Sequence, residues 1–184
     1  MGRLKQLLSL GDKPAVRRCL DSLVDAGIQD IVVVTGPDAA ALKKAADGLP
    51  VRFVRNTASE SEMAESVRIG LAATDRHAAG VLVCLSDHPL VSPETLTALV
   101  EAYAGQPGNI IIPVCHERNG HPCLFPADLI QGIFFGNTLR DIIGSNRKRV
   151  IRLPVEDEGV IFDMDTMEDY RRLEKKFREL KDKK

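Results

Sequence analysis

The chain lacks several features that mark special classes of protein. Tryptophan is absent and aromatic residues make up 4% of the 184 residues, so the core has to be built from Leu, Ile, Val and Ala. No stretch approaches the roughly 18 consecutive apolar residues of a membrane span. A net charge of -1 argues against a nucleic-acid binder, because such proteins usually carry a strong basic excess. The length instead suits one ordinary globular domain over residues 1–184.

Cysteine is also scarce, with four residues scattered along the chain, too few for a disulfide framework. Two of them lie with two histidines in the segment 115–123, and Cys and His are zinc-ligand types. The spacing is not that of a C-x2-C pair, however, and Asn119-Gly120 predicts a tight hairpin turn between two strands. Neighbouring side chains of a hairpin point to opposite faces, so we expect no zinc site here.

The N-terminus carries neither a secretion signal nor a myristoylation signal. Its apolar stretch at 7–10 is too short for the first, and Gln6 stands where the second requires a hydroxyl residue. We therefore expect a cytoplasmic protein with no membrane partner.

Hydrophobic patterning predicts strands that alternate with helices. Strands are expected at 28–35, 51–54, 80–85, 109–114, 123–125, 149–155 and 160–162. Helices are expected at 12–26, 37–47, 62–73, 92–103, 127–132, 137–144 and from 166 to near the end. Asp12 is a candidate cap for the first helix, and Ser92 for the fourth. The alternation indicates βαβ units, hence an α/β fold with a mostly parallel sheet and one β-hairpin excursion.

Acidic residues follow two of the predicted strands. Ligands of open parallel sheets bind beyond the carboxyl ends of the strands, where Asp87 is well placed to hold Mg²⁺ beside a phosphate. The alternative is that Asp87 caps a helix or satisfies a turn, although its distance in sequence from Ser92 weakens the cap. Asp163 and Asp165 share one face if the chain there is extended.

Two roles are open for this second acidic pair. Asp165 or Thr166 could cap the last helix, with Glu168 or Asp169 completing a capping box. Alternatively, Asp87 and Asp165 could together hold one Mg²⁺ against a triphosphate, an arrangement that stabilises charge during transfer at phosphorus.

Few basic residues are candidates for binding phosphates at such a site. Lys5, before the first helix, could pair with phosphates as a point charge, or could simply be a solvated lysine. The chain contains neither of the glycine-rich phosphate-binding patterns G-x-G-x-x-G and Walker A. It also contains no G-x-S-x-G pattern, so the sequence gives no support to a hydrolase triad.

Several segments occur in an order that is informative as a set. They are 1–14, 27–36, Asn56 to Met63 with Ser66-Val67-Arg68 and Gly70, Ser86-Asp87-His88-Pro89-Leu90-Val91, Gly120-His121-Pro122 and 163–170. In this order they resemble the motifs of the MobA-like nucleotidyltransferases, most of all the molybdenum cofactor cytidylyltransferases. The resemblance covers nearly the whole chain.

The resemblance implies a three-layer Rossmann-like fold of the nucleotide-diphospho-sugar transferase type. It implies Mg²⁺-dependent transfer of a nucleoside monophosphate, CMP from CTP, to a molybdopterin-type phosphate acceptor with release of pyrophosphate. Guanylyl transfer and sugar-1-phosphate activation stay open as alternatives. A molybdoenzyme or its accessory protein is the implied protein partner.

The resemblance also implies roles for individual residues. Asp87 and Asp165 would hold the metal, and Lys5 would neutralise the transferring phosphates, which makes Lys5 and Asp87 the catalytic residues. The implied nucleotide-binding residues are Lys5, Asn56, Met63, Ser66 and Ser86, and the implied acceptor-binding residues are His121 and Pro122. The acceptor phosphate is itself the nucleophile, so no protein base is required.

The chain departs from the family pattern at its front and in single residues. The glycine-rich loop of the family, L-A-A-G-x-S-x-R-M-G-x-x-K, begins before Met1, so a first strand and most of that loop are expected to be missing, with unpaired strand edges as the result. Glu62 stands for Gly, Ala64 for Ser and His88 for Gln. These departures favour the alternative of a non-catalytic nucleotide-binding or accessory module.

Overall fold

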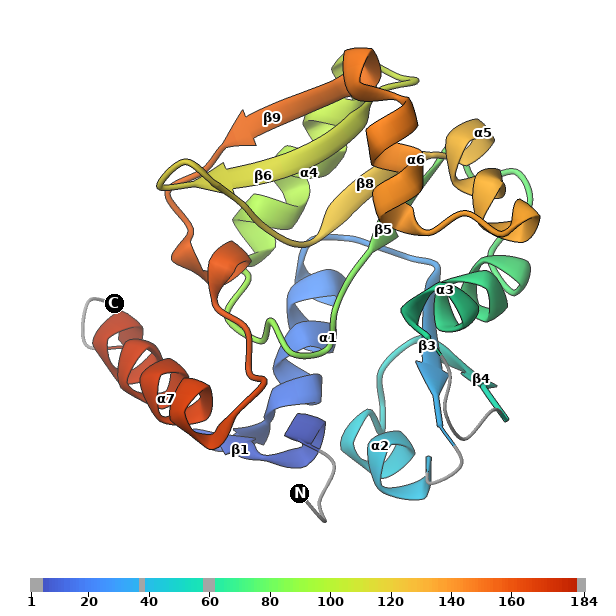
Figure 1. Ribbon diagram of the computed structural model, residues 1–184. Coiled ribbons are helices and arrows are strands. Elements are labelled where there is room, and N and C mark those ends of the chain that lie inside the picture. The colour runs from blue at the N-terminus through green and yellow to red at the C-terminus, as the bar shows by residue number, and fades with distance from the viewer. Residues whose placement is uncertain (1–4, 37–38, 58–61, 182–184) are drawn as a thin grey trace.

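The computed structural model describes residues 5–36, 39–57 and 62–181 (Figure 1). The strands are β1 (Ser9–Leu10), β2 (Lys13–Pro14), β3 (Ile31–Thr35), β4 (Val51–Arg55), β5 (Gly80–Val83), β6 (Ile110–Cys115), β7 (Arg118–Asn119), β8 (Cys123–Pro126) and β9 (Val150–Pro154). The helices are α1 (Ala15–Asp25), α2 (Ala40–Ala45), α3 (Met63–Ala72), α4 (Pro93–Gly105), α5 (Ala127–Ile130), α6 (Leu139–Ser145) and α7 (Met167–Lys181). Short 3-10 turns are η1 (Lys5–Leu7), η2 (Gln131–Phe135), η3 (Arg147–Arg149) and η4 (Glu158–Ile161). Across these described ranges, no helix is both long enough and apolar enough for a membrane span.

The predicted α/β class is confirmed, and the main sheet is mixed. Strand β8 lies antiparallel between β5 and β6, while β9 is parallel to β6. Strands β3 and β4 form a separate parallel pair, and β1 and β2 a small antiparallel one. The antiparallel excursion is the hairpin of β6 and β7 followed by β8.

Several strands have a free edge in the described part of the chain. There β3 and β4 pair only with each other, β5 pairs only with β8, and β7 and β9 each pair only with β6. Open sheets always end in such edges, so the expectation of a missing first strand stays a prediction.

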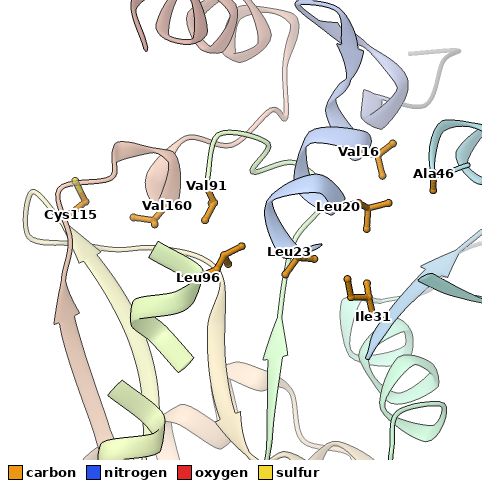
Figure 2. Packing of buried hydrophobic residues seen from close by; sticks show 9 residues of the cluster. All are labelled: Val16, Leu20, Leu23, Ile31, Ala46, Val91, Leu96, Cys115 and Val160. Carbon is orange, nitrogen blue, oxygen red and sulfur yellow. The ribbon is translucent and has the colours of Figure 1, made fainter. Parts of the chain in front are cut away.

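Helix α1 joins the two sheet regions through side chains. Val16, Leu20 and Leu23 recur at helical spacing and are 4%, 5% and 8% exposed. Figure 2 shows them between Ile31 and Ala46 on one side and Val91 and Leu96 on the other. Full burial of such a side chain contributes about 1.5–3 kcal/mol, so this packing holds β3 near α4 without strand pairing.

Helix α1 begins later than predicted, at Ala15. Pro14 is the N-cap residue and its segment pairs with β1, because the preceding residues form the β1–β2 hairpin. Asp12 therefore caps nothing; its carboxylate lies 2.6 Å from the guanidinium of Arg18. The prediction for Ser92 is confirmed, since its hydroxyl accepts a hydrogen bond from the Thr95 amide at 3.2 Å.

Two predictions around the hairpin were wrong. The turn lies at His116 and Glu117, with φ of 48° and 61°, instead of Asn119-Gly120. A two-residue turn of this hand needs positive φ at both positions, and the register of β6 with β7 overrides the preference for glycine. The predicted strand 160–162 is instead the 3-10 turn η4, which begins where Asp157 accepts a hydrogen bond from the Gly159 amide.

Candidate active site

Three predicted site residues, far apart in sequence, meet at one point. The ammonium of Lys5 donates to Asp87 Oδ2 at 3.0 Å and to Asp165 Oδ1 at 2.6 Å. Lys5 is the first residue of η1, Asp87 follows β5, and Asp165 precedes α7. The fold therefore gathers two carboxylates and one cation from the beginning, middle and end of the chain.

Local structure explains why Asp165 faces this point. Its neighbour Met164 is 1% exposed and anchors the segment in the core, so the side chains on either side of Met164 face outward. The cap of α7 is Thr166, whose hydroxyl accepts from the Asp169 amide at 3.1 Å while the Asp169 carboxylate accepts from the Thr166 amide at 2.9 Å. The capping box is thus confirmed with Thr166 and Asp169, and Asp165 remains available to Lys5.

The two carboxylates of this cluster stabilise the charged form of Lys5. Burial by itself would lower the pKa of Lys5, but hydrogen bonds and charge attraction from Asp165 and Asp87 outweigh it and raise the pKa. Lys5 is therefore an ammonium at neutral pH.

The two carboxylates also fit a divalent metal. Asp87 Oδ1 is buried without a hydrogen-bond partner, and Asp87 and Asp165 already converge on one cation. The described ranges contain no group of three or more Asp, Glu, His or Cys side chains arranged around a metal position. A divalent metal held by these two carboxylates would complete its coordination with substrate phosphates and water.

Two histidines lie beside this carboxylate pair. His88 is 8% exposed, its Nδ1 is buried without a partner, and its Nε2 lies 3.9 Å from Asp87 Oδ1. Its ring centroid is 5.3 Å from that of His121. Sequence reasoning noted His88 only as a departure from the family; its place directly after Asp87 was the available signal.

His121 and Pro122, predicted on the acceptor side, lie next to the carboxylates. The His121 amide donates to the Val160 carbonyl at 2.8 Å, and the His121–Pro122 peptide is cis. Burial and the neighbouring His88 lower the pKa of His121, against the opposite influence of Asp87 and Asp163. The imidazole is therefore neutral near pH 7 and offers one hydrogen-bond donor and one acceptor.

Asn56 and Ser66, predicted at the nucleotide site, form a second group. Asn56 follows β4, is 4% exposed, and its Nδ2 donates to Ser66 Oγ on α3 at 3.2 Å. Met63, by contrast, is 56% exposed at the start of α3. Ser86 is exposed, and its carbonyl accepts from Cys19 Sγ at 3.7 Å. Residues 1–4 and 58–61 of the resembling segments lie outside the described residues.

The two cysteines and two histidines of segment 115–123 do not converge on one point. Cys115 and Cys123 are buried at 2% and 6% exposure, whereas His116 is on the turn with its Nε2 3.2 Å from Glu158 Oε1. His121 instead belongs to the carboxylate site, with Nδ1 4.0 Å from Cys123 Sγ.

Two carboxylates and a lysine that converge on one point can together hold a divalent cation and a phosphate group. A family model, the MobA-like NTP transferase domain, matches residues 1–151. The chain belongs to this family, and a nucleoside triphosphate is accordingly its class of substrate.

Solved structures agree in fold. Rv0371c from Mycobacterium tuberculosis H37Rv is 30% identical, with a TM-score of 0.80 over 95% of this chain and 91% of that chain. A structure of Rv0371c in complex with manganese gives a TM-score of 0.77 at 30% identity over 95% of this chain and 93% of that chain. A nucleotidyl transferase from Methanothermobacter thermautotroptrophicus (Mth528) is 22% identical, with a TM-score of 0.81 over 96% of this chain and 86% of that chain, which shows a shared fold.

Proposed function

We propose that the chain transfers CMP from CTP to the terminal phosphate of a molybdopterin-type acceptor, with Mg²⁺ held by Asp87 and Asp165. The observation that carries this proposal is the convergence of Lys5, Asp87 and Asp165 on one point, in a chain whose motif order resembles that of the molybdenum cofactor cytidylyltransferases. The manganese complex of Rv0371c supports a divalent metal in this fold.

The reaction requires positioning and charge neutralisation more than a protein nucleophile. An oxygen of the acceptor phosphate attacks the α-phosphorus of CTP, the bond from the α-phosphorus to the bridging oxygen breaks, and pyrophosphate leaves with that bond's electrons. Mg²⁺ supplies Lewis-acid neutralisation of the phosphate oxygens. Lys5 would add a second positive charge beside these phosphate oxygens.

The acceptor side follows from the two histidines. The His121 ring lies against that of His88, the neighbour of Asp87, with ring centroids 5.3 Å apart. A neutral imidazole donates one hydrogen bond to the incoming phosphate without holding the product by a full ion pair. We assign His121 and Pro122 to the acceptor and Asn56 and Ser66 to the nucleotide.

The test is a panel of the four nucleoside triphosphates with molybdopterin-type acceptor and Mg²⁺, read by pyrophosphate release. We expect release with CTP that depends on both acceptor and metal. Release with GTP instead would assign guanylyl transfer. A parallel panel replaces the molybdopterin-type acceptor with a sugar 1-phosphate, and release only in that panel would assign sugar activation. Calorimetric binding of CTP without any turnover would overturn catalysis and leave the non-catalytic nucleotide-binding module.

A further inference from the structure

Lys5 occupies the position that a metal would need. Its Nζ lies 3.0 Å from Asp87 Oδ2 and 2.6 Å from Asp165 Oδ1, so the one ammonium contacts both carboxylates at once. An ammonium and a divalent cation repel each other at this short separation, and the repulsion is least screened on the part-buried Asp87 side of the site. The two cations cannot both lie between these oxygens.

We propose that Lys5 is the resident counter-ion of the Asp87–Asp165 pair, and that divalent metal exchanges with its ammonium, which then turns to the triphosphate. The inference rests on the proposed function, since it takes these two carboxylates as the metal ligands. It makes the binding of metal and nucleotide interdependent: the metal releases the cation that the triphosphate needs.

The structure allows this exchange without opening the core. The side chains of Lys5 and Asp165 are 28% and 64% exposed, so both can move in solvent. A lysine carries its charge on a flexible four-carbon stem and can turn to a new anion while its backbone stays in place. Asp87 is 20% exposed, and its partnerless Oδ1 offers the metal a further oxygen once Oδ2 is released.

The exchange also gives Lys5 two successive partners. Without metal, its charge is balanced by two carboxylates, and a triphosphate would add more negative charge to a cluster that is already anionic. With metal, the carboxylates are neutralised and Lys5 gains by pairing with phosphate oxygens. Lys5 thereby opposes metal binding to the empty site and favours it when nucleotide is present.

The first experiment measures Mn²⁺ binding to the full chain by electron paramagnetic resonance, without nucleotide. Lys5→Met removes the competing charge, and we expect it to bind Mn²⁺ ~10-fold more tightly than the wild type, which corresponds to about 1.4 kcal/mol. Lys5→Arg keeps the charge and is expected to bind Mn²⁺ as the wild type does. Equal or weaker binding by Lys5→Met than by the wild type overturns the exchange.

A double variant separates the failure of this inference from that of the metal site. Adding Asp87→Asn to Lys5→Met is expected to abolish the tight Mn²⁺ binding. If both the wild type and Lys5→Met lose Mn²⁺ on Asp87→Asn but bind it equally, the metal site stands and the exchange is refuted. If the double variant binds Mn²⁺ as Lys5→Met does, the metal lies elsewhere, and the exchange and the proposed metal site both fail.

A second measurement needs no variant. A short pulse of acetic anhydride with peptide mass spectrometry reports how freely each lysine amine reacts. We expect saturating Mg²⁺ to raise the acetylation of Lys5 by about threefold or more, because a hydrogen-bonded ion pair shields the amine. Lys13 is the internal control, since its Nζ lies 2.5 Å from Asp21 Oδ2, outside the site. Lys5 acetylation that Mg²⁺ leaves unchanged would refute the exchange.

Discussion

At the scale of single residues, the site depends on which acid faces which cation. Asp87 and Asp165 share Lys5, whereas Lys13 and Arg17 both pair with Asp21 on α1. The cations near the front of the chain therefore differ in their partners: Lys5 bridges two acids from distant segments, Lys13 links β2 to α1, and Arg17 pairs with Asp21 within α1.

Replacement of Asp87 tests the catalytic assignment. We expect Asp87→Asn to lower the rate of pyrophosphate release by about 100-fold or more, because it removes a charge that acts on the reacting phosphates. Asp128→Asn is the matched control, since Asp128 pairs with Arg149 on the surface at 3.2 Å. A rate for Asp87→Asn within about twofold of this control, by the same assay, would remove Asp87 from the metal site.

Asp21 predicts how stability depends on pH. Burial would raise its pKa, but hydrogen bonds from Lys13 and Arg17 outweigh burial and lower the pKa below its ordinary value. A group with a lowered folded pKa stabilises the protein above its unfolded pKa, near 3.9 for aspartate, and this stabilisation is lost as the pH falls through the folded value. We expect Asp21→Asn to cost about 1 kcal/mol at neutral pH.

The measurement is urea unfolding of wild type and variant at several pH values. The cost of Asp21→Asn should shrink towards zero below about pH 3. Asp25→Asn, at the exposed end of the same helix, is the control and should show no comparable loss. A cost for Asp21→Asn that stays constant down to acid pH would contradict the ion-pair explanation.

At the scale of elements, the 3-10 turn η4 positions the segment that carries His121, the residue proposed to bind the acceptor. The carbonyl of Val160 in η4 accepts from the His121 amide, and a Cβ at Gly120 would lie 2.6 Å from that carbonyl oxygen. Gly120 is thus required by the close approach of η4 to the segment that carries His121, and the hairpin turn itself lies elsewhere.

Adding a single methyl group at Gly120 tests this arrangement. Gly120→Ala is expected to cost about 2 kcal/mol of unfolding free energy, because backbone must shift to admit the methyl group, and to raise the KM for acceptor more than that for CTP. Gly144→Ala, on α6 where the new Cβ would meet nothing within 4 Å beyond its own helix backbone and chain neighbours, is expected to stabilise by about 0.5 kcal/mol. Thermal unfolding and steady-state kinetics measure both. Equal effects of the two substitutions would contradict the close approach.

At the scale of the whole molecule, the C-terminal helix secures the front of the chain. Figure 1 shows α7 beside β1, and the Tyr170 hydroxyl donates to the Ser9 carbonyl at 2.6 Å. Leu173 is fully buried and packs in a cluster with Leu10 and Met164, the residue before Asp165. This cluster fixes the distance between the segments that carry Lys5 and Asp165.

Truncation of Leu173 tests that role. Leu173→Ala is expected to cost about 3 kcal/mol through lost burial and a cavity, and to weaken CTP binding because the Lys5 and Asp165 segments loosen. Leu180→Ala on the same helix, where Leu180 is 40% exposed, should change stability by less than about 0.5 kcal/mol. Denaturant unfolding and calorimetry provide the two readouts. A Leu173→Ala protein as stable as Leu180→Ala would show that α7 does not secure the core.

The sequence alone determined the features that depend on neighbours along the chain. Alternating apolar strands and helices indicated the α/β class, Ser92 was recognisable as a cap, Thr166 and Asp169 were among the candidates for a capping box, and Asp87 was recognisable as an acid after an apolar strand. These features follow from local periodicity and short-range hydrogen bonds, which a linear pattern records.

Only the tertiary structure decided the contacts between distant segments. It paired Lys5 with both Asp87 and Asp165, buried His88 against His121, moved the hairpin turn to His116 and made η4 a 3-10 turn. Each of these results depends on strand register or on packing between residues tens of positions apart. Such interactions outweigh local preferences because they bury surface and satisfy charge in ways that no short stretch of sequence contains.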